Sequence, residues 1–316
     1  MIETRKNSKQ EVVQVSNKKF QGVFNLLNSQ KVVPYVFISP FVLSFLLLSL
    51  YPAIQAIIMS FQRVLPGEIT FIGLRNYQRI LNPTFYTALQ NTTVYMVLTV
   101  VILVSIPMLL AVLLNSKVVK FRILFRTSLF LPALTSVIVA GMVFRLMFAE
   151  SDTAVANQII NWVGLDSVDW RYNAWSGMFL MVVLASWRWM GINILYFLAA
   201  LQNVPKELYE AAEIDGANTL QKFLYVTLPF LKPVTIFVAT ISIIGGFRMF
   251  EESFVFWTSG SPGNIGLTIV GYLYQEGIQQ NDMGFGAAIG VVLMAIIFVI
   301  SLTQLYLTGA FKRGDE

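Results

Sequence analysis

The sequence predicts an all-α integral membrane protein with six transmembrane helices. Of its 316 residues, 56% are hydrophobic and only 12% are charged, whereas charged residues make up about a quarter of an ordinary soluble domain. Six apolar stretches each exceed the roughly 20 residues that a helix needs to cross about 30 Å of hydrocarbon. Together these features exclude a soluble globular domain, a disordered chain and a coiled coil.

The expected spans contain several prolines, which predict kinks of the kind that neighbouring helices tolerate inside a membrane. Pro40 and Pro52 lie in the first span, Pro107 in the second, and Pro132 near the start of the third. The six spans are expected over residues 35–61, 88–115, 127–148, 177–201, 233–257 and 284–307.

The basic residues predict the orientation of the chain. Fifteen of the 22 Lys and Arg lie in the two tails and in the loops after the second and fourth spans, against four on the opposite side and three within spans. The positive-inside rule therefore places both termini in the cytoplasm. It also accounts for the basic N-terminal tail without nucleic-acid binding. The acidic segments 150–175 and 259–283 are then expected to be extracellular loops.

The expected organisation follows from this orientation. Residues 1–32 form a cytoplasmic N-terminal tail, residues 33–309 form the six-helix transmembrane domain, and residues 310–316 form a cytoplasmic C-terminal tail. Residues 203–230, between the fourth and fifth spans, form a cytoplasmic loop inside the transmembrane domain.

Missing residue types limit the chemistry of the chain. It has no cysteine and no histidine, which excludes disulfides, thiolate and imidazole metal sites, and catalysis by Ser-His-Asp or Cys-His groups. It also lacks a glycine-rich phosphate loop ending in Gly-Lys-Ser/Thr, so no built-in ATP site is expected. We therefore predict no catalytic residue, no metal site and no cofactor in this chain.

The loop after the fourth span is predicted to be a helical hairpin. Residues 206–214 are good helix formers that follow Pro205. Asp215 and Gly216 form a turn, and residues 217–228 form a second helix that Pro229 ends. Such a hairpin either docks in a groove of a partner protein or packs against its own bundle at the membrane surface. The pattern of residues leaves both alternatives open.

Eight residues of this loop form a further pattern: Glu210, Ala211, Ala212, Asp215, Gly216, Ala217, Leu228 and Pro229. The pattern resembles the EAA loop that marks the permease subunits of binding-protein-dependent ABC importers. Val226 stands where that loop usually has Ile. The resemblance implies that the hairpin is the coupling helix and that these eight residues are its coupling residues. Such a helix fits a cleft on a cytoplasmic ATPase and converts closure of the ATPase dimer into opening of the permease.

The likeness extends over residues 33–312. Tyr51-Pro52, residues 73–77 and Asn91-Thr92 are similar to the sugar-importer branch of these permeases, and the turn near residue 260 resembles the MalF-type partner of the two permeases. Residues 245–253 and 261–266 resemble most closely the arabino-oligosaccharide permeases of Gram-positive bacteria. The resemblance implies the six-helix fold of a type I ABC importer permease.

The resemblance also implies partners and a substrate. The partners are a second, MalG-type permease, two copies of a cytoplasmic ABC ATPase that binds ATP and Mg²⁺, and an extracellular solute-binding protein. The chain is expected to lie in the lipid bilayer of the plasma membrane and to translocate an oligosaccharide, with arabino-oligosaccharides as the nearest class.

Polar groups inside the spans mark a candidate substrate pathway. Arg188 lies near the midplane of the fourth span, between Trp187 and Trp189, with Asn193 about one turn further on. A charge at this depth is costly and is a functional hypothesis by default. Aromatic faces stack on sugar rings, while Arg and Asn bind hydroxyls. The alternative is an ion pair between Arg188 and a carboxylate of another helix that only fixes the bundle.

Three charged residues of the fifth span complete this hypothesis. Glu251 and Glu252 follow Arg248 at i+3 and i+4, which favours a local ion pair on one helix, although a contact with Arg188 stays open. An ion-coupled secondary transporter is the alternative function, and it typically needs midplane carboxylates. Both glutamates are expected to lie too near the outer surface for that role, and the missing His and Cys disfavour a membrane enzyme.

Overall fold

The computed structural model describes residues 29–116, 119–258 and 260–309. The expected C-terminal tail, 310–316, lies outside the described residues, as does the expected N-terminal tail except for residues 29–32. The chain divides into two compact units, residues 1–58 and 59–316, and each is described by itself.

The first unit contains most of the first span. Helix α2 (Val33–Phe45), the π-helical turn η1 (Leu46–Leu50) and helix α3 (Tyr51–Ser60) follow one another without a break. In the π turn the N–H of Tyr51 donates to the carbonyl of Leu46, five residues back. Because Pro52 has no N–H and its ring clashes with the carbonyl four residues back, the wider turn lets the helix continue through it.

The second unit begins with a hairpin that the sequence analysis did not predict. Strands β1 (Gln62–Leu65) and β2 (Glu68–Phe71) pair antiparallel, with Pro66 and Gly67 as the loop. Gly67 has φ 81°, the conformation that glycine adopts at the third position of a type II turn after proline. The Pro66-Gly67 pair was therefore the sequence signal from which this hairpin could have been predicted.

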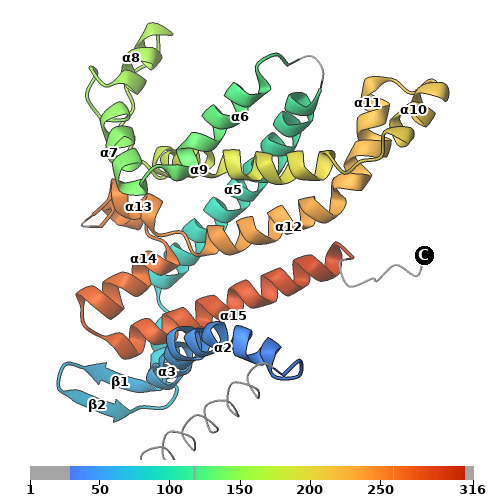
Figure 1. Ribbon diagram of the computed structural model, residues 1–316. Coiled ribbons are helices and arrows are strands. Elements are labelled where there is room, and N and C mark those ends of the chain that lie inside the picture. Colours follow the sequence, from blue (N-terminus) through green and yellow to red (C-terminus); the bar gives the residue numbers. More distant parts are fainter. Residues whose placement is uncertain (1–28, 117–118, 259, 310–316) are drawn as a thin grey trace, which may run out of the picture. The chain divides into compact units, whose positions relative to one another are not determined.

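Four long helices build the core of the second unit. They are α5 (Pro83–Asn115), α9 (Ala174–Leu201), α12 (Leu228–Phe247) and α15 (Met283–Leu307). Helix α5 packs against both α9 and α12, and α12 packs against α15 (Figure 1). With the first span they make five helices of the described residues that are long and apolar enough to cross a membrane. The expected spans two, four and six are confirmed within a few residues.

The third span, expected over 127–148, is bent sharply just after Pro132, so the predicted kink is confirmed but separates two helices. Helix α6 (Arg122–Phe130) and the 3₁₀ turn η2 (Leu131–Leu134) are bent by 99° from helix α7 (Val137–Met147). Pro132 opens the 3₁₀ turn, where its missing N–H ends the α-helical bonding. The backbone of α6 also lies directly against α9. A Cβ on Gly191 of α9 would clash with the carbonyl of Leu129 of α6, so this contact requires glycine.

The fifth span differs from expectation at both ends. Pro229 does not end a helix: α11 (Thr219–Lys222) and the π turn η3 (Phe223–Thr227) continue directly into α12. The N–H of Leu228 donates to the carbonyl of Phe223, five residues back, so this turn accommodates Pro229 as η1 accommodates Pro52. At the other end α12 ends at Phe247, and α13 (Glu251–Phe256) is a separate short helix.

The two segments expected as loops are partly helical. The first contains α8 (Val155–Trp162), and the second contains α14 (Ile269–Tyr274) followed by the π turn η5 (Gln275–Gln279). The buried Asn157 organises the first segment, since its amide donates to three backbone carbonyls and accepts from Trp170 Nε1 at 2.8 Å. The side chain of Asn157 thus pairs backbone carbonyls of this segment that lie outside its helix.

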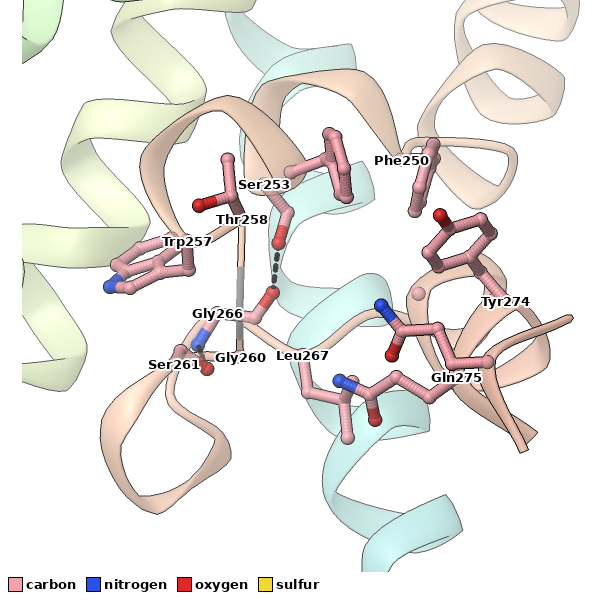
Figure 2. Close-up of a pocket in the computed structure, with 13 residues that line it drawn as sticks. Phe250, Ser253, Trp257, Thr258, Gly260, Ser261, Gly266, Leu267, Tyr274 and Gln275 are labelled. Carbon is pink, nitrogen blue, oxygen red and sulfur yellow. Dashed lines mark hydrogen bonds between the residues drawn. The ribbon is translucent and has the colours of Figure 1, made fainter.

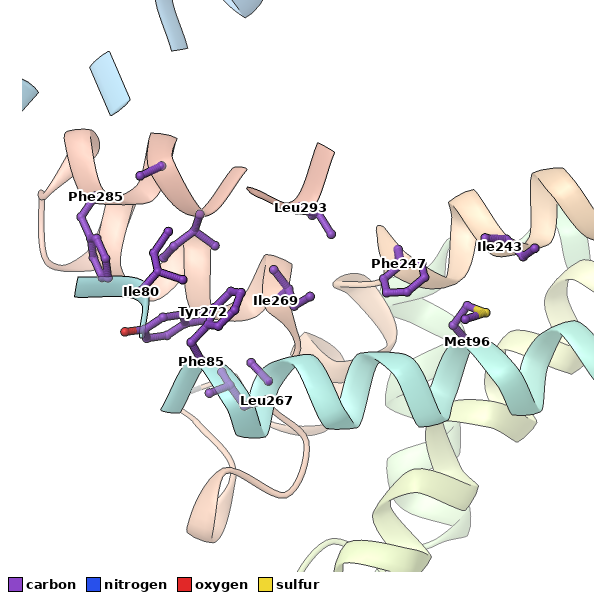
Figure 3. Packing of buried hydrophobic residues seen from close by; sticks show 13 residues of the cluster. Ile80, Phe85, Met96, Ile243, Phe247, Leu267, Ile269, Tyr272, Phe285 and Leu293 are labelled. Atoms are coloured by element: carbon purple, nitrogen blue, oxygen red, sulfur yellow. The ribbon is translucent and has the colours of Figure 1, made fainter. Parts of the chain in front are cut away.

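A hydrophobic cluster joins α5, α12, α14 and α15 near the start of α15 (Figure 3). Thr92 and Asn91 of α5 strengthen this junction by bonding to backbone. Thr92 Oγ1 accepts from the N–H of Ile269, and Asn91 Nδ2 donates to the carbonyls of Asn264 and Leu267. The largest buried members of the cluster are Phe85, Phe247, Tyr272 and Phe285.

Candidate functional site

A cavity of about 490 Å³ lies between α5, α9 and the α12–α13 junction. Helices α5 and α12 approach closely beside it. A Cβ on Gly246 of α12 would clash with Met96 of α5, so this approach requires glycine. After Phe247 the chain leaves the helix, and α13 starts at Glu251. This break, and not a continuous fifth span, brings the acidic start of α13 to the cavity.

Arg188 and Glu252 form a buried ion pair in the cavity wall. Nη1 of Arg188 lies 3.2 Å from Oε1 of Glu252 and 3.6 Å from Oε2 of Glu251. The side chains of Arg188 and Glu252 are only 11% and 8% exposed, whereas that of Glu251 is 60% exposed. The guanidinium carbon of Arg188 also lies 5.3 Å from the ring centroid of Trp189, within the range of a cation–π contact.

The expected ion pair of Arg248 with the two glutamates is wrong. Because α12 ends before Arg248, the three residues do not share a helix and the i, i+4 geometry is lost. The carboxylates turn to Arg188, midway along α9, so Glu252 lies deeper than the outer position that the sequence predicted. Arg248 is exposed and lines the cavity, and no ion pair of Arg248 occurs in the described part of the chain.

Asn193 ties two helices together beside the same cavity. Its Nδ2 donates to the backbone carbonyl of Leu103 at 2.9 Å. That carbonyl lies four residues before Pro107, which has no N–H to donate to it. The amide nitrogen of Asn193 thus supplies the hydrogen bond that the proline removes from α5, and Asn193 also lines the cavity.

Six of the seven predicted pathway residues line the cavity, and Trp187 does not. Its ring lies 5.7 Å from that of Phe144 on α7. The polar and aromatic lining residues that sequence reasoning missed are Tyr95, Thr99, Tyr196, Ser242 and Phe250. Single polar or aromatic residues in apolar spans have no spacing that distinguishes a cavity wall from a helix contact, so no sequence signal was available.

The predicted hairpin in the loop after α9 is a compact unit of two helices and a tight turn, called here the α10–α11 hairpin. Helix α10 (Lys206–Ile214) has the predicted bounds. It ends in a Schellman motif, since Ala217 donates to the carbonyl of Ala212 and Gly216 donates to that of Glu213. Gly216 has φ 76°, which a residue with a Cβ adopts only at a cost.

The second helix of the hairpin is held just as locally. Asn218 and Gln221 form a complete capping box at the start of α11. Lys222 Nζ lies 2.6 Å from Glu213 Oε1, and the hydroxyls of Tyr209 and Thr227 lie 2.9 Å apart. These bonds join the two helices of the α10–α11 hairpin to each other.

The surface of the α10–α11 hairpin is open. Helix α10 buries none of its residues, which argues against packing on its own bundle. Ile214, beside the turn, is 88% exposed. Figure 1 shows the hairpin at one end of α9 and α12, with α13 at the opposite end. Five of the eight predicted coupling residues are exposed: Glu210, Ala211, Asp215, Gly216 and Pro229.

At the far end from the hairpin, Arg171 clamps Glu150 with two bonds of 2.7 Å. This bidentate contact holds the pKa of Glu150 below its usual range. It closes the segment that contains α8, and Trp257 Nε1 bonds to the carbonyl of Arg171 at 3.0 Å.

Comparison with known proteins identifies the family. Residues 168–313 match the binding-protein-dependent transport system inner membrane component. The arabinooligosaccharides transport system permease protein AraP of Halalkalibacterium halodurans is 84% identical over 316 residues, the whole of both chains. The chain belongs to the permeases of binding-protein-dependent ABC importers. It is a membrane-embedded transport subunit and not an enzyme.

Solved structures support the fold assignment. A bacterial ABC transporter that imports the acidic polysaccharide alginate superposes with a TM-score of 0.80 at 22% identity, over 92% of this chain and 99% of the other. The same kind of transporter in complex with an alginate pentasaccharide-bound periplasmic protein gives a TM-score of 0.79 at 22% identity, over 89% and 95% of the two chains. The type I importer permease fold predicted from the EAA pattern is therefore confirmed.

Proposed function

We propose that this permease passes an uncharged oligosaccharide, of the arabino-oligosaccharide class, through the cavity between α5, α9 and α13. The buried pair of Arg188 and Glu252 carries the proposal. Two arginines and two glutamates line the cavity, so its formal charges sum to zero and the cavity has no net charge to attract an acidic sugar. The relative with 84% identity is named for arabino-oligosaccharides, which agrees with an uncharged substrate.

The cavity wall offers both kinds of contact that a sugar needs. Trp189 and Tyr196 present aromatic faces for the C–H face of a sugar ring. Thr99, Ser242 and Asn193 offer hydrogen-bond partners for hydroxyls. A site midway along the spanning helices is where transporters commonly hold their substrate.

The α10–α11 hairpin is the proposed coupling element. An exposed isoleucine beside a glycine turn suits a docking surface, since a few well-packed residues near the centre of an interface contribute most of its binding energy. Its partner is one of two cytoplasmic ABC ATPase subunits that bind ATP and Mg²⁺, and the ATPase movement reaches α9 and α12 through the hairpin.

The remaining assembly follows from the family. A second, MalG-type permease completes the pathway, and an extracellular binding protein delivers the sugar. Both termini are cytoplasmic, as the bias of basic residues indicates. Reporter fusions after Asp166 are expected to lie outside and those after Asn218 inside, and an inverted result at Asn218 would exclude the coupling role.

Two neighbouring tryptophans give a matched test of the substrate site. Trp189 lines the cavity and Trp187 does not. We expect Trp189→Ala to lower uptake of arabino-oligosaccharides about tenfold, the effect of 1.4 kcal/mol, while Trp187→Ala leaves it within about twofold of the wild type. Complex yield is measured in parallel. Equal losses of uptake in both variants at normal yield would exclude the cavity as the sugar site.

A further inference from the structure

A second hollow, called here the outer groove, lies between α13 and the α14–η5 segment (Figure 2). It is found at the end of α12 that faces away from the α10–α11 hairpin. Phe250 lines both the outer groove and the large cavity, so the two are adjacent. The residues of the outer groove that carry the argument are Phe250, Phe254, Thr258, Tyr274, Gln275 and Gln279.

Three aromatic rings form one wall of the outer groove. Phe250 and Phe254 are stacked with centroids 5.1 Å apart, and Tyr274 lies 5.2 Å from Phe250 and 5.7 Å from Phe254. All three side chains are only half-buried. A cluster that served packing alone would bury these rings, whereas a half-exposed aromatic wall suits the apolar face of a sugar.

Polar side chains without partners form the other wall. Gln275 and Gln279 lie one turn apart on the π turn η5, and Figure 2 shows Gln275 beside Tyr274, which lies between it and Phe250. Within the described residues neither carboxamide makes a hydrogen bond, whereas the neighbouring Gln280 bonds to Glu276 at 3.2 Å. π-Helical turns occur often at functional sites, and amides that both donate and accept suit sugar hydroxyls.

The size of the outer groove decides how a ligand would lie. It encloses only about 30 Å³, far less than the roughly 300 Å³ or more of a pocket that surrounds its ligand. A sugar unit therefore lies across the groove, with one face on the aromatic wall and its hydroxyls toward the two glutamines, and is not enclosed.

We propose that the outer groove is a second sugar subsite, which holds the units of a longer oligosaccharide that extend outward from the cavity past Phe250. The inference rests on the proposed function, because it assumes that the cavity holds the first units. It predicts that the groove acts on long chains and not on short ones.

Transport of two chain lengths tests this subsite. The complete importer is reconstituted with its binding protein, and uptake of arabinotetraose is compared with that of arabinobiose. We expect Gln279→Ala to lower the tetraose-to-biose uptake ratio about fivefold, which matches the loss of about one net hydrogen bond, and Phe254→Ala to lower it at least as much. Gln280→Ala is the control, since Gln280 does not line the groove.

The outcomes separate this inference from the proposed function. If the wild type imports both sugars and Gln279→Ala leaves the ratio unchanged, the outer groove is not a subsite, although the cavity proposal stands. If Phe254→Ala lowers both uptakes equally, its ring only packs α13 on α14 and the aromatic wall is excluded. If the wild type imports neither sugar, the proposed function fails and this inference fails with it.

Discussion

The α10–α11 hairpin and the cavity are held by contacts of very different range. Within the hairpin, the capping box joins residues three apart in the sequence. The hydrogen bond with the largest sequence separation, between Tyr209 and Thr227, joins residues 18 apart. At the cavity, Arg188 meets Glu252 64 residues away, and Asn193 meets Leu103 90 residues away. An element that is held by such local hydrogen bonds keeps its shape when a partner protein exerts force on it. A wall made of distant helices changes shape when those helices move.

This difference suits the two tasks of a permease. In the proposed function the hairpin transmits the movement of the ATPase to the permease, and a rigid element passes on such a movement in full. In the same proposal the cavity alternates between holding and releasing a sugar, which requires helices that separate at a few contacts. The pair of Arg188 and Glu252 is such a contact, since it joins α9 to the short α13 across the break after α12.

The largest effect is expected at the turn of the hairpin. Gly216→Val forces a β-branched residue into φ 76° and adds bulk at the docking surface, which together remove several kcal/mol of interaction. We expect sugar uptake to be abolished with normal membrane insertion, and Glu210→Lys to reduce it less. Hydrolysis stimulated by the loaded binding protein is the measurement.

A second glycine provides the matched control for this prediction. Gly164 has φ 86° with open space around it, but it lies in the α8 segment. Gly164→Val therefore introduces the same backbone strain without touching the hairpin and should retain uptake. If Gly216→Val retains normal stimulated hydrolysis as well, the hairpin is not the coupling element.

The next effect concerns the ion pair. Removing one partner of a buried pair leaves an unpaired charge, which costs about 3–5 kcal/mol. Arg188→Ala is expected to lower both the melting temperature and the yield of the complex, in addition to uptake. The double variant Arg188→Met with Glu252→Met should recover stability without recovering uptake. A double variant as unstable as Arg188→Ala would show that the pair is not the contact that holds α13.

Asn193 and Pro107 form a smaller, paired test. Asn193→Leu leaves the carbonyl of Leu103 without a donor, which costs about 1–3 kcal/mol. Pro107→Ala restores an N–H four residues after that carbonyl, so Asn193→Leu should cost much less in the Pro107→Ala background. The melting temperatures of the four variants form a double-mutant cycle, and purely additive effects would refute the shared hydrogen bond.

The smallest effect is a pH dependence outside the membrane. Arg171 lowers the pKa of Glu150 in the folded protein, so the ionised carboxylate stabilises the fold. This stabilisation is present above the unfolded pKa of about 4.3 and is lost as the pH falls through the lower folded pKa. Glu150→Gln should remove this part of the acid dependence of the melting temperature. If the melting temperature of Glu150→Gln falls at low pH just as that of the wild type does, the prediction is wrong.

The sequence predicted the hairpin better than the cavity for the same physical reason. The Schellman turn and capping box depend on residues a few positions apart, so α10 was predicted to the residue. The break after Phe247 and the pairing of Glu252 with Arg188 depend on α5, α9 and α13 meeting. Periodicity along one segment contains no such information, and it therefore extended the fifth span to 257.

Prolines show the same limit within single helices. Pro132 breaks the third span, but Pro107 and Pro229 lie inside continuous helices. The difference arises from the surroundings: Asn193 satisfies the carbonyl freed by Pro107, and the π turn η3 accommodates Pro229. Neither compensation is visible in the residues beside the proline.

The central claim, that sugar passes through the cavity, has a direct test because the chain has no cysteine. Ser242→Cys places the only thiol of this chain in the cavity wall, and Trp187→Cys places one outside it. Maleimide labelling is followed in the reconstituted importer during turnover. The account predicts that arabino-oligosaccharide with its binding protein slows labelling at position 242 and leaves position 187 unchanged. Equal labelling with and without sugar at position 242 would contradict it.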